Sequence, residues 1–166
     1  DRVRRLAARW MRSGEPLARE GIAHGQDTVT KFIAEGFPDG AVVFLDVEHN
    51  SGTLSPPMEE YIPGWISPIL DSGRIEAGIY CPTSKANEIR TAAAKEYAAH
   101  GVPNGSPVFW AVKVDPRFDP ATSTPTGSGV SYASVWQGRL DINETHGGVT
   151  IKIDQNVAGS RSPSNA

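Results

Sequence analysis

The sequence contains one cysteine, no long apolar run and no excess of basic residues, and each of these absences narrows the possible functions. Cys81 has no second cysteine with which to form an internal disulfide, so cysteine usage does not identify the compartment. It ends an apolar segment, which favours a buried structural thiol over a nucleophile. No run approaches the length of about 18 apolar residues that a membrane span needs, and no signal peptide is visible.

The charge balance argues against a polyanion as partner. The formal net charge is -3 and the pI is near 5.8, and no cluster of Lys and Arg is interleaved with aromatic residues. We therefore expect no nucleic-acid partner. The four histidines are scattered without metal-ligand spacing, so we expect no metal site and no cofactor. One alternative stays open, in which His49 joins Asp46 and Glu48 around a divalent cation.

The composition is that of a soluble globular domain. Of the 166 residues, 39% are hydrophobic and 21% are charged, which is enough apolar material for one core. We predict a single, monomeric domain over residues 1–158, followed by a polar, disordered tail over 159–166.

Residues 41–50 carry the strongest signal in the chain, because the apolar run Ala-Val-Val-Phe-Leu ends in Asp46 and Glu48. The run is typical of a parallel strand that is buried on both faces, so we expect it in the middle of a sheet. Side chains alternate along a strand, which places the two carboxylates on one face, with Cα atoms about 7 Å apart. Ligands bind at the carboxyl ends of such strands. The alternative is that both residues cap the following loop or form ion pairs with neighbours.

The remaining elements follow from periodicity and from turn residues. Helices are predicted at 2–12, 27–35, 56–70 and 84–100, with Ser55 as a helix N-cap and with Pro63 and Pro68 as kinks. Residues 13–26 contain no convincing strand. Strands are predicted at 75–81, 108–114, 132–137 and 149–154, and the last three have no helices between them. The long loop at 115–129 is predicted to form a functional rim.

The order of these elements, with Asp-x-Glu closing the first strand, resembles the family 25 glycoside hydrolases, the lysozyme-like muramidases. It resembles more closely the bacterial glycoside-hydrolase-like domain of the DUF1906 group. The segments that carry the resemblance, in order, are 36–48, 78–81, 109–111, 136–137 and 153–156. The resemblance implies an α/β fold of the irregular, TIM-like (β/α) barrel type, with C-terminal strands that lack intervening helices. A family barrel needs earlier strands, one of which carries another groove carboxylate, so we expect this barrel to be incomplete at the N-terminus.

The resemblance also implies a function and a site. Glu48 becomes the general acid and Asp46 the base or the stabiliser of a charged intermediate, since glycosidic cleavage needs one protonated and one ionised carboxyl group. The implied substrate-binding residues are Tyr80, Trp110, Trp136, Gln137 and Asp154. For each of the two tryptophans, a purely structural core position stays an alternative. For Asp154 the alternative is a structural hydrogen-bonding role.

Two functions therefore compete at this point. One is a hydrolase of cell-wall-type glycans such as peptidoglycan, and the other is a non-catalytic glycan-binding or structural domain that keeps the groove. By resemblance alone, the protein is expected to be secreted or to lie at the cell surface.

Overall fold

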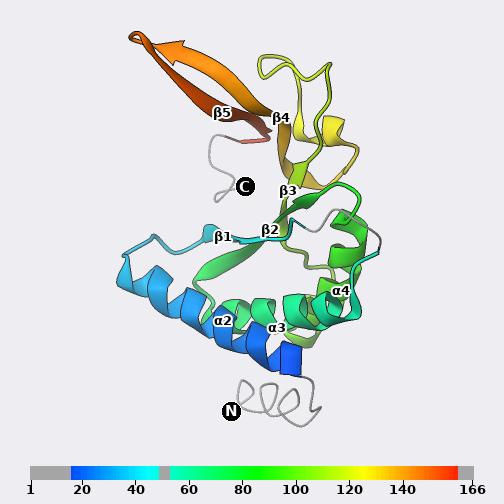
Figure 1. The fold of residues 1–166 in the computed structure, drawn as a ribbon. Coiled ribbons are helices and arrows are strands. Elements are labelled where there is room, and N and C mark those ends of the chain that lie inside the picture. The colour runs from blue at the N-terminus through cyan, green and yellow to red at the C-terminus, as the bar shows by residue number, and fades with distance from the viewer. Residues whose placement is uncertain (1–15, 49–52, 161–166) are drawn as a thin grey trace. The chain divides into compact units, whose positions relative to one another are not determined.

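The computed structural model describes residues 16–48 and 53–160 (Figure 1). Within these ranges the fold is mixed α/β, with three α-helices, one short 3₁₀ helix and five strands. Their order is α2 (Pro16–Ala34), β1 (Ala41–Asp46), α3 (Pro56–Ser72), β2 (Ile75–Pro82), α4 (Ala86–Ala99), β3 (Val108–Val112), η1 (Pro125–Ser128), β4 (Ala133–His146) and β5 (Val149–Ala158).

The chain divides into two compact units, each of which we describe by itself. The helical unit contains residues 16–43, 53–77 and 87–107, and thus the three α-helices. The strand unit contains residues 44–48, 78–86 and 108–160, and thus β3, β4, β5 and the ends of β1 and β2. The single domain expected for residues 1–158 stays a prediction.

Helix α2 is longer than predicted, because it begins at Pro16 and not near residue 27. Gly21 and Gly25 lie in this segment, and glycine lowers helix propensity by about 1 kcal/mol relative to alanine. In the structure both glycines are buried against α3. A Cβ atom on Gly21 would collide with the carbonyl oxygen of Tyr61, and one on Gly64 would lie 2.5 Å from that of Ala18. The glycines therefore allow two helix backbones to approach closely.

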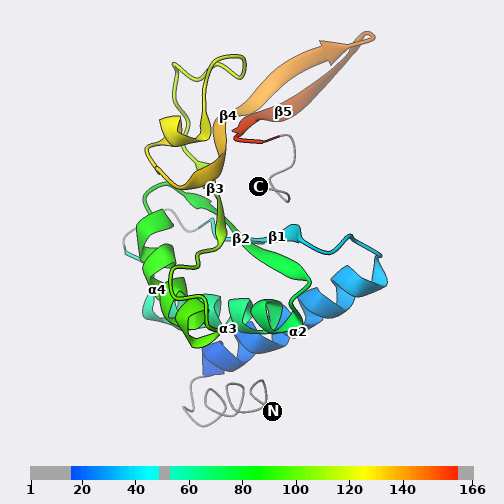
Figure 2. The same ribbon diagram turned by 180° about the vertical axis from the view of Figure 1, so that it is seen from behind.

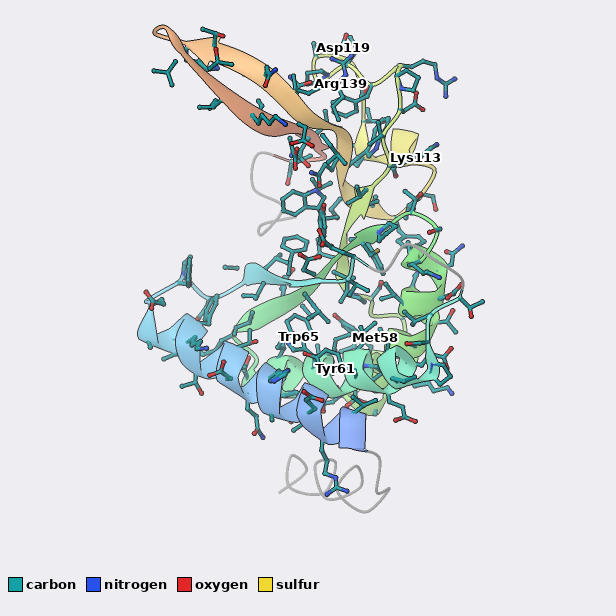
Figure 3. All side chains as sticks on the ribbon, viewed as in Figure 1. Met58, Tyr61, Trp65, Lys113, Asp119 and Arg139 are labelled. Carbon is teal, nitrogen blue, oxygen red and sulfur yellow. The ribbon has the colours of Figure 1, made fainter. Side chains whose placement is uncertain are left out.

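Polar side chains also join α2 to α3. The Nδ1 atom of His24 is 2.8 Å from the hydroxyl of Tyr61, and the indole N–H of Trp65 donates to Oγ1 of Thr28 at 3.3 Å. Tyr61 and Trp65 lie on the side of α3 that faces α2 (Figure 3). The glycine contacts and these bonds lie along one interface.

We expect Gly21→Ala to destabilise the helical unit by about 1–3 kcal/mol, because overpacking outweighs the gain in helix propensity. Gln26→Ala, at an exposed position of the same helix, should change the free energy of unfolding by about 0.5 kcal/mol at most. Urea denaturation of both variants measures the difference. Equal or greater stability of Gly21→Ala would contradict the close approach of the two helices.

The five strands form one sheet in the order β1-β2-β3-β4-β5. Strand β3 is parallel to β2 and to β4, whereas β4 and β5 are antiparallel. The predicted central position of β1 is wrong, because within the described residues β1 has a neighbour on one side only. Its residues 41–45 are half-buried rather than buried on both faces. Side-chain patterns report which faces of a strand are covered, but they do not report whether both of its backbone edges are paired.

The irregular TIM-like barrel also stays a prediction. Five strands that end in an antiparallel pair do not by themselves make a closed, all-parallel barrel. The helix predicted at 2–12 and the tail from residue 161 lie outside the described residues. Among the helices that are described, none is both long and apolar enough to cross a membrane.

The other predicted elements are confirmed with shifts at their ends. Helix α3 follows Ser55 and is capped by Gly73, whose positive φ of 62° suits a C-cap glycine. Helix α4 lies within the predicted range. No α-helix separates β3 from β4 in this fully described segment, although the 3₁₀ helix η1 does. Strands β4 and β5 are both longer than predicted, because they continue together as a hairpin through residues 138–158.

Candidate functional site

The strand unit contains a pocket of about 390 Å³ that receives side chains from or next to all five strands. Three of its residues are carboxylic acids, three are aromatic and two are amides. They are Phe44, Asp46, Glu48, Tyr80, Trp110, Gln137, Asp154 and Asn156. Six of the seven residues predicted for the site are in this set, and Trp136 is not.

Alternation along the strands explains how these residues meet. Asp46 and Glu48 are exposed, whereas Val47 between them is buried. The backbone N–H of Val47 donates to the carbonyl of Tyr80 at 2.8 Å, so the chain stays beside β2 just past the end of β1. The two carboxylates therefore lie on one face, as predicted.

The pairing of the other strands places their pocket residues on the same face of the sheet as Asp46 and Glu48. Tyr80 pairs with Trp110 across β2 and β3. Val112, two residues beyond Trp110, pairs with Gln137 of β4, and Gln137 pairs with Asn156 of β5. Residues that pair across neighbouring strands lie on the same face of the sheet. The pocket residues of β2, β3, β4 and β5 therefore lie on one face.

Three aromatic rings form the wall of the pocket. The ring of Trp110 meets those of Phe44 and Tyr80 edge-on, with centroids 5.5 and 5.3 Å apart. Its indole N–H donates to Oδ1 of Asn156 at 2.9 Å. Trp110 is thus held from both sides in a fixed orientation.

Asp154 is held by two hydrogen bonds. Its Oδ2 atom accepts from the side-chain amide of Gln137 at 2.7 Å, and its Oδ1 atom accepts from the backbone N–H of Asp141 at 2.9 Å. Gln137 is 3% exposed. Asp154 therefore combines the structural role that was left open with a position in the pocket lining.

The titration of Tyr80 reports the charge of the pocket. Burial raises the pKa of Tyr80 above its ordinary value of 10.0, and the carboxylates of Asp46 and Glu48 raise this pKa further, as does that of Asp154. A hydrogen bond with the side chain of Gln137 acts in the opposite direction on the same pKa. Negative potential from three carboxylates thus converges on one phenol.

The described residues offer these carboxylates no cationic partner. None of the residues that line the pocket is basic, and no described Lys, Arg or His forms an ion pair with Asp46 or Glu48. The alternative of ion pairs with neighbours thus finds no support in residues 16–48 and 53–160. In the same ranges no three His, Cys, Asp or Glu side chains are arranged to hold a metal ion. His49, on which the cation alternative depended, lies outside them.

The assignment of Trp136 to the pocket wall is not supported, because it lies on the opposite face of the sheet. It is 4% exposed and packs with Phe118 and Val157, and its indole N–H donates to the carbonyl of Lys113 at 2.9 Å. Gln137 follows Trp136 directly, so only one of the two can face the pocket. The core alternative is the one that the structure supports.

The long loop at 115–129 does not form a rim of this pocket, since no residue of the loop lines it. Phe118 anchors the loop on the face that carries Trp136, and it packs closely over Gly138. The loop thus contributes Phe118 to the apolar core on that face of the sheet.

Cys81 also lies on the face away from the pocket. It is fully buried next to Tyr80, and burial raises its pKa to about 12. A thiol with this pKa stays protonated at neutral pH, which supports the structural interpretation.

Two residues of the pocket, Phe44 and Asn156, were not assigned to it from the sequence. The signal was present, because Phe44 precedes Asp46 by two residues and Asn156 follows Asp154 by two. Strand alternation alone places each of them beside a predicted site residue.

Comparisons with known proteins define the class to which this fold and pocket belong. The chain belongs to the family described as the Rv2525c-like, glycoside hydrolase-like domain, whose family model matches residues 6–158. The fold is similar to the crystal structure of an uncharacterized B. stearothermophilus protein, with a TM-score of 0.57 and 19% sequence identity over 86% of this chain. The chain spans 63% of that protein. At this identity the likeness concerns the fold alone. A search of functionally curated proteins finds no match.

We expect Asp46→Asn to lower the pKa of Tyr80, because it removes one of the charges that disfavour the phenolate. NMR titration of ring-labelled tyrosine measures this pKa. Tyr61 is the internal reference, since its pKa is raised by burial and then by Glu20. Glu144→Gln, on the hairpin, is the matched control. An unchanged Tyr80 pKa in Asp46→Asn would show that the carboxylate does not act on the phenol.

Proposed function

We propose that the domain binds cell-wall-type glycans such as peptidoglycan in this pocket and hydrolyses an O-glycosidic bond as a monomer. Glu48 is the general acid, and Asp46 is the base or the stabiliser of the charged intermediate. The observation that carries the proposal is the presence of both carboxylates and an aromatic wall in one pocket of a glycoside hydrolase-like domain. A secreted or cell-surface location and an irregular TIM-like barrel are part of the proposal.

The chemistry assigns a separate task to each group. Cleavage requires a proton on the leaving oxygen and negative charge beside the oxocarbenium-like centre, and Glu48 and Asp46 provide these two functions. Phe44, Tyr80 and Trp110 offer ring surfaces for the apolar face of a sugar. Asp154, held in place by Gln137, accepts hydrogen bonds from hydroxyl groups.

A second function is favoured by the exposure of the two carboxylates. Both Asp46 and Glu48 are exposed to solvent, whereas a general acid is usually set in an environment that excludes water. A non-catalytic glycan-binding domain that keeps the pocket would need no such enclosure. Turnover decides between the two functions, since both predict binding.

We expect Glu48→Gln to lower glycan cleavage by roughly 10²-fold or more, the usual range for a lost general acid. The free energy of unfolding should change by about 0.5 kcal/mol at most, because Glu48 makes no ion pair with a described residue. Paired thermal melts and turnover assays on peptidoglycan and on chitin-type oligosaccharides measure both quantities. Glu35→Gln, at an exposed position in the helical unit, is the matched control and should behave as wild type.

The outcomes of this assay separate the two functions. No turnover by wild type on any glycan, with binding retained, would overturn the hydrolase proposal and support the binding domain. If Glu48→Gln were destabilised enough for the unfolded fraction to account for its lost turnover, Glu48 would be a structural residue.

We expect Trp110→Ala to weaken glycan binding by roughly tenfold or more, because it removes the ring at the centre of the wall. Trp110→Phe keeps a ring and should retain most of the affinity. Trp136→Phe is the matched control on the opposite face, and it should lower stability without changing affinity. Isothermal titration calorimetry with a chitin-type oligosaccharide measures these affinities, and equal affinities of wild type and Trp110→Ala would remove Trp110 from the site.

A further inference from the structure

The hairpin of β4 and β5 continues beyond the end of β3 as a two-stranded ribbon (Figures 1 and 2). Strand β5 alternates regularly along this ribbon. Asp154, Lys152 and Thr150 precede Asn156 at intervals of two residues, so they share its face, which is the pocket side. The opposite face of β5 carries Val149, Ile151, Ile153 and Gln155.

Strand β4 matches this pattern after two bulges. Between Gln137 and Ile142 it contains two more residues than the facing part of β5, and from Ile142 onward the pairing is regular. Asn143 pairs with Lys152 and Thr145 pairs with Thr150, which places all four on the pocket side. We call these four residues the polar strip.

The two faces of the ribbon differ in composition. The polar strip is exposed on one face, whereas the other face is mixed: Val149 and Ile151 are exposed there by 62% and 49%, beside the ion pair of Glu144 and His146. Exposure to water favours polar residues on either face of an uncovered ribbon, so it does not by itself select the pocket side. The face that is polar throughout is the one that continues the pocket.

Asp154 joins the strip to the pocket. Its neighbour Asp141 lies in the second bulge with a positive φ of 54°, a conformation that non-glycine residues adopt rarely. This backbone turn directs the N–H of Asp141 to Oδ1 of Asp154, whose Oδ2 atom accepts from Gln137 in the pocket. The beginning of the strip is therefore fixed to the pocket by one carboxylate.

The groups of the strip suit a polyhydroxylated chain. The hydroxyls of Thr145 and Thr150 are 2.8 Å apart, and Lys152 lies 3.6 Å from the carboxylate of Asp141 with both side chains mostly exposed. Exposed pairs of this kind contribute little to stability, so a ligand can replace them at small cost. They provide both donors and acceptors, which sugar hydroxyls require.

We propose that the polar strip is a distal subsite of the pocket, which binds the continuation of a glycan chain whose end or cleavage point lies at Asp46 and Glu48. This inference rests on the proposed function. From Asn156 to Thr150 the strand rise gives roughly 20 Å, so the ligand is an oligosaccharide rather than one or two sugars.

The test compares a short and a long ligand on the same protein. The probes are the dimer and the hexamer of β-1,4-linked N-acetylglucosamine, and their affinities are measured by isothermal titration calorimetry. We expect wild type to bind the hexamer at least tenfold more tightly than the dimer. The variant Thr145→Val, Thr150→Val, Lys152→Met removes the polar groups but keeps branched or long side chains that suit a strand. It should lose about tenfold or more of its hexamer affinity and keep its dimer affinity, since it lacks the hydrogen-bonding groups that only the longer ligand reaches.

The control and the outcomes separate this inference from the proposed function. Val149→Thr, on the opposite face, should leave both affinities unchanged, and a thermal melt checks that every variant is folded. Equal binding of dimer and hexamer by wild type, or an unchanged hexamer affinity in the triple variant, would overturn the distal subsite and leave the proposed function intact. Absence of binding to either saccharide by wild type would overturn both.

Discussion

The alternation of side chains along an extended backbone decides which residues of this protein can act together. Each strand has two faces, and the register between strands fixes which faces coincide. From Phe44 to Asn156, one face gathers the carboxylates and the aromatic wall of the pocket. The other face carries Trp136 and Val157, which form an apolar core with Phe118. A slip of one residue in any strand would exchange a pocket residue for a core residue.

This constraint separates what the sequence could predict from what it could not. Asp46 and Glu48 belong to one strand segment, so their common face follows from the sequence alone. Trp136 and Gln137 were both assigned to the site, although adjacent residues of a strand cannot share a face. The choice between them depends on the register of β4 against β3 and β5, and no local pattern specifies that register. Strand β4 was predicted too short for a related reason. Its two bulges interrupt the alternation of polar and apolar residues from which a strand is predicted.

In the helical unit, too, a feature that depends on tertiary packing was not predicted from the sequence. Residues 13–26 were not predicted to be helical, and Gly21 and Gly25 do lower the helix propensity of this segment. Tertiary packing overrides that preference, as the two glycines let α2 approach the backbone of α3. A glycine that weakens an isolated helix can thus be the residue that a pair of helices requires. Helix α3, whose apolar spacing is strong, was predicted despite Pro63 and Pro68.

The openness of the pocket sets a condition on how it could select a ligand. Its two acidic residues are exposed, so a single sugar would exchange water for few enclosed contacts. An open site gains affinity and selectivity by contacting a longer ligand at several points, each of which contributes little. The hydrogen bonds from Gln137 and from the bulge at Asp141 hold Asp154 where pocket and hairpin meet. A chain-shaped ligand that crosses this point would contact the aromatic wall and the polar strip at once, whereas a small molecule could reach only one of them.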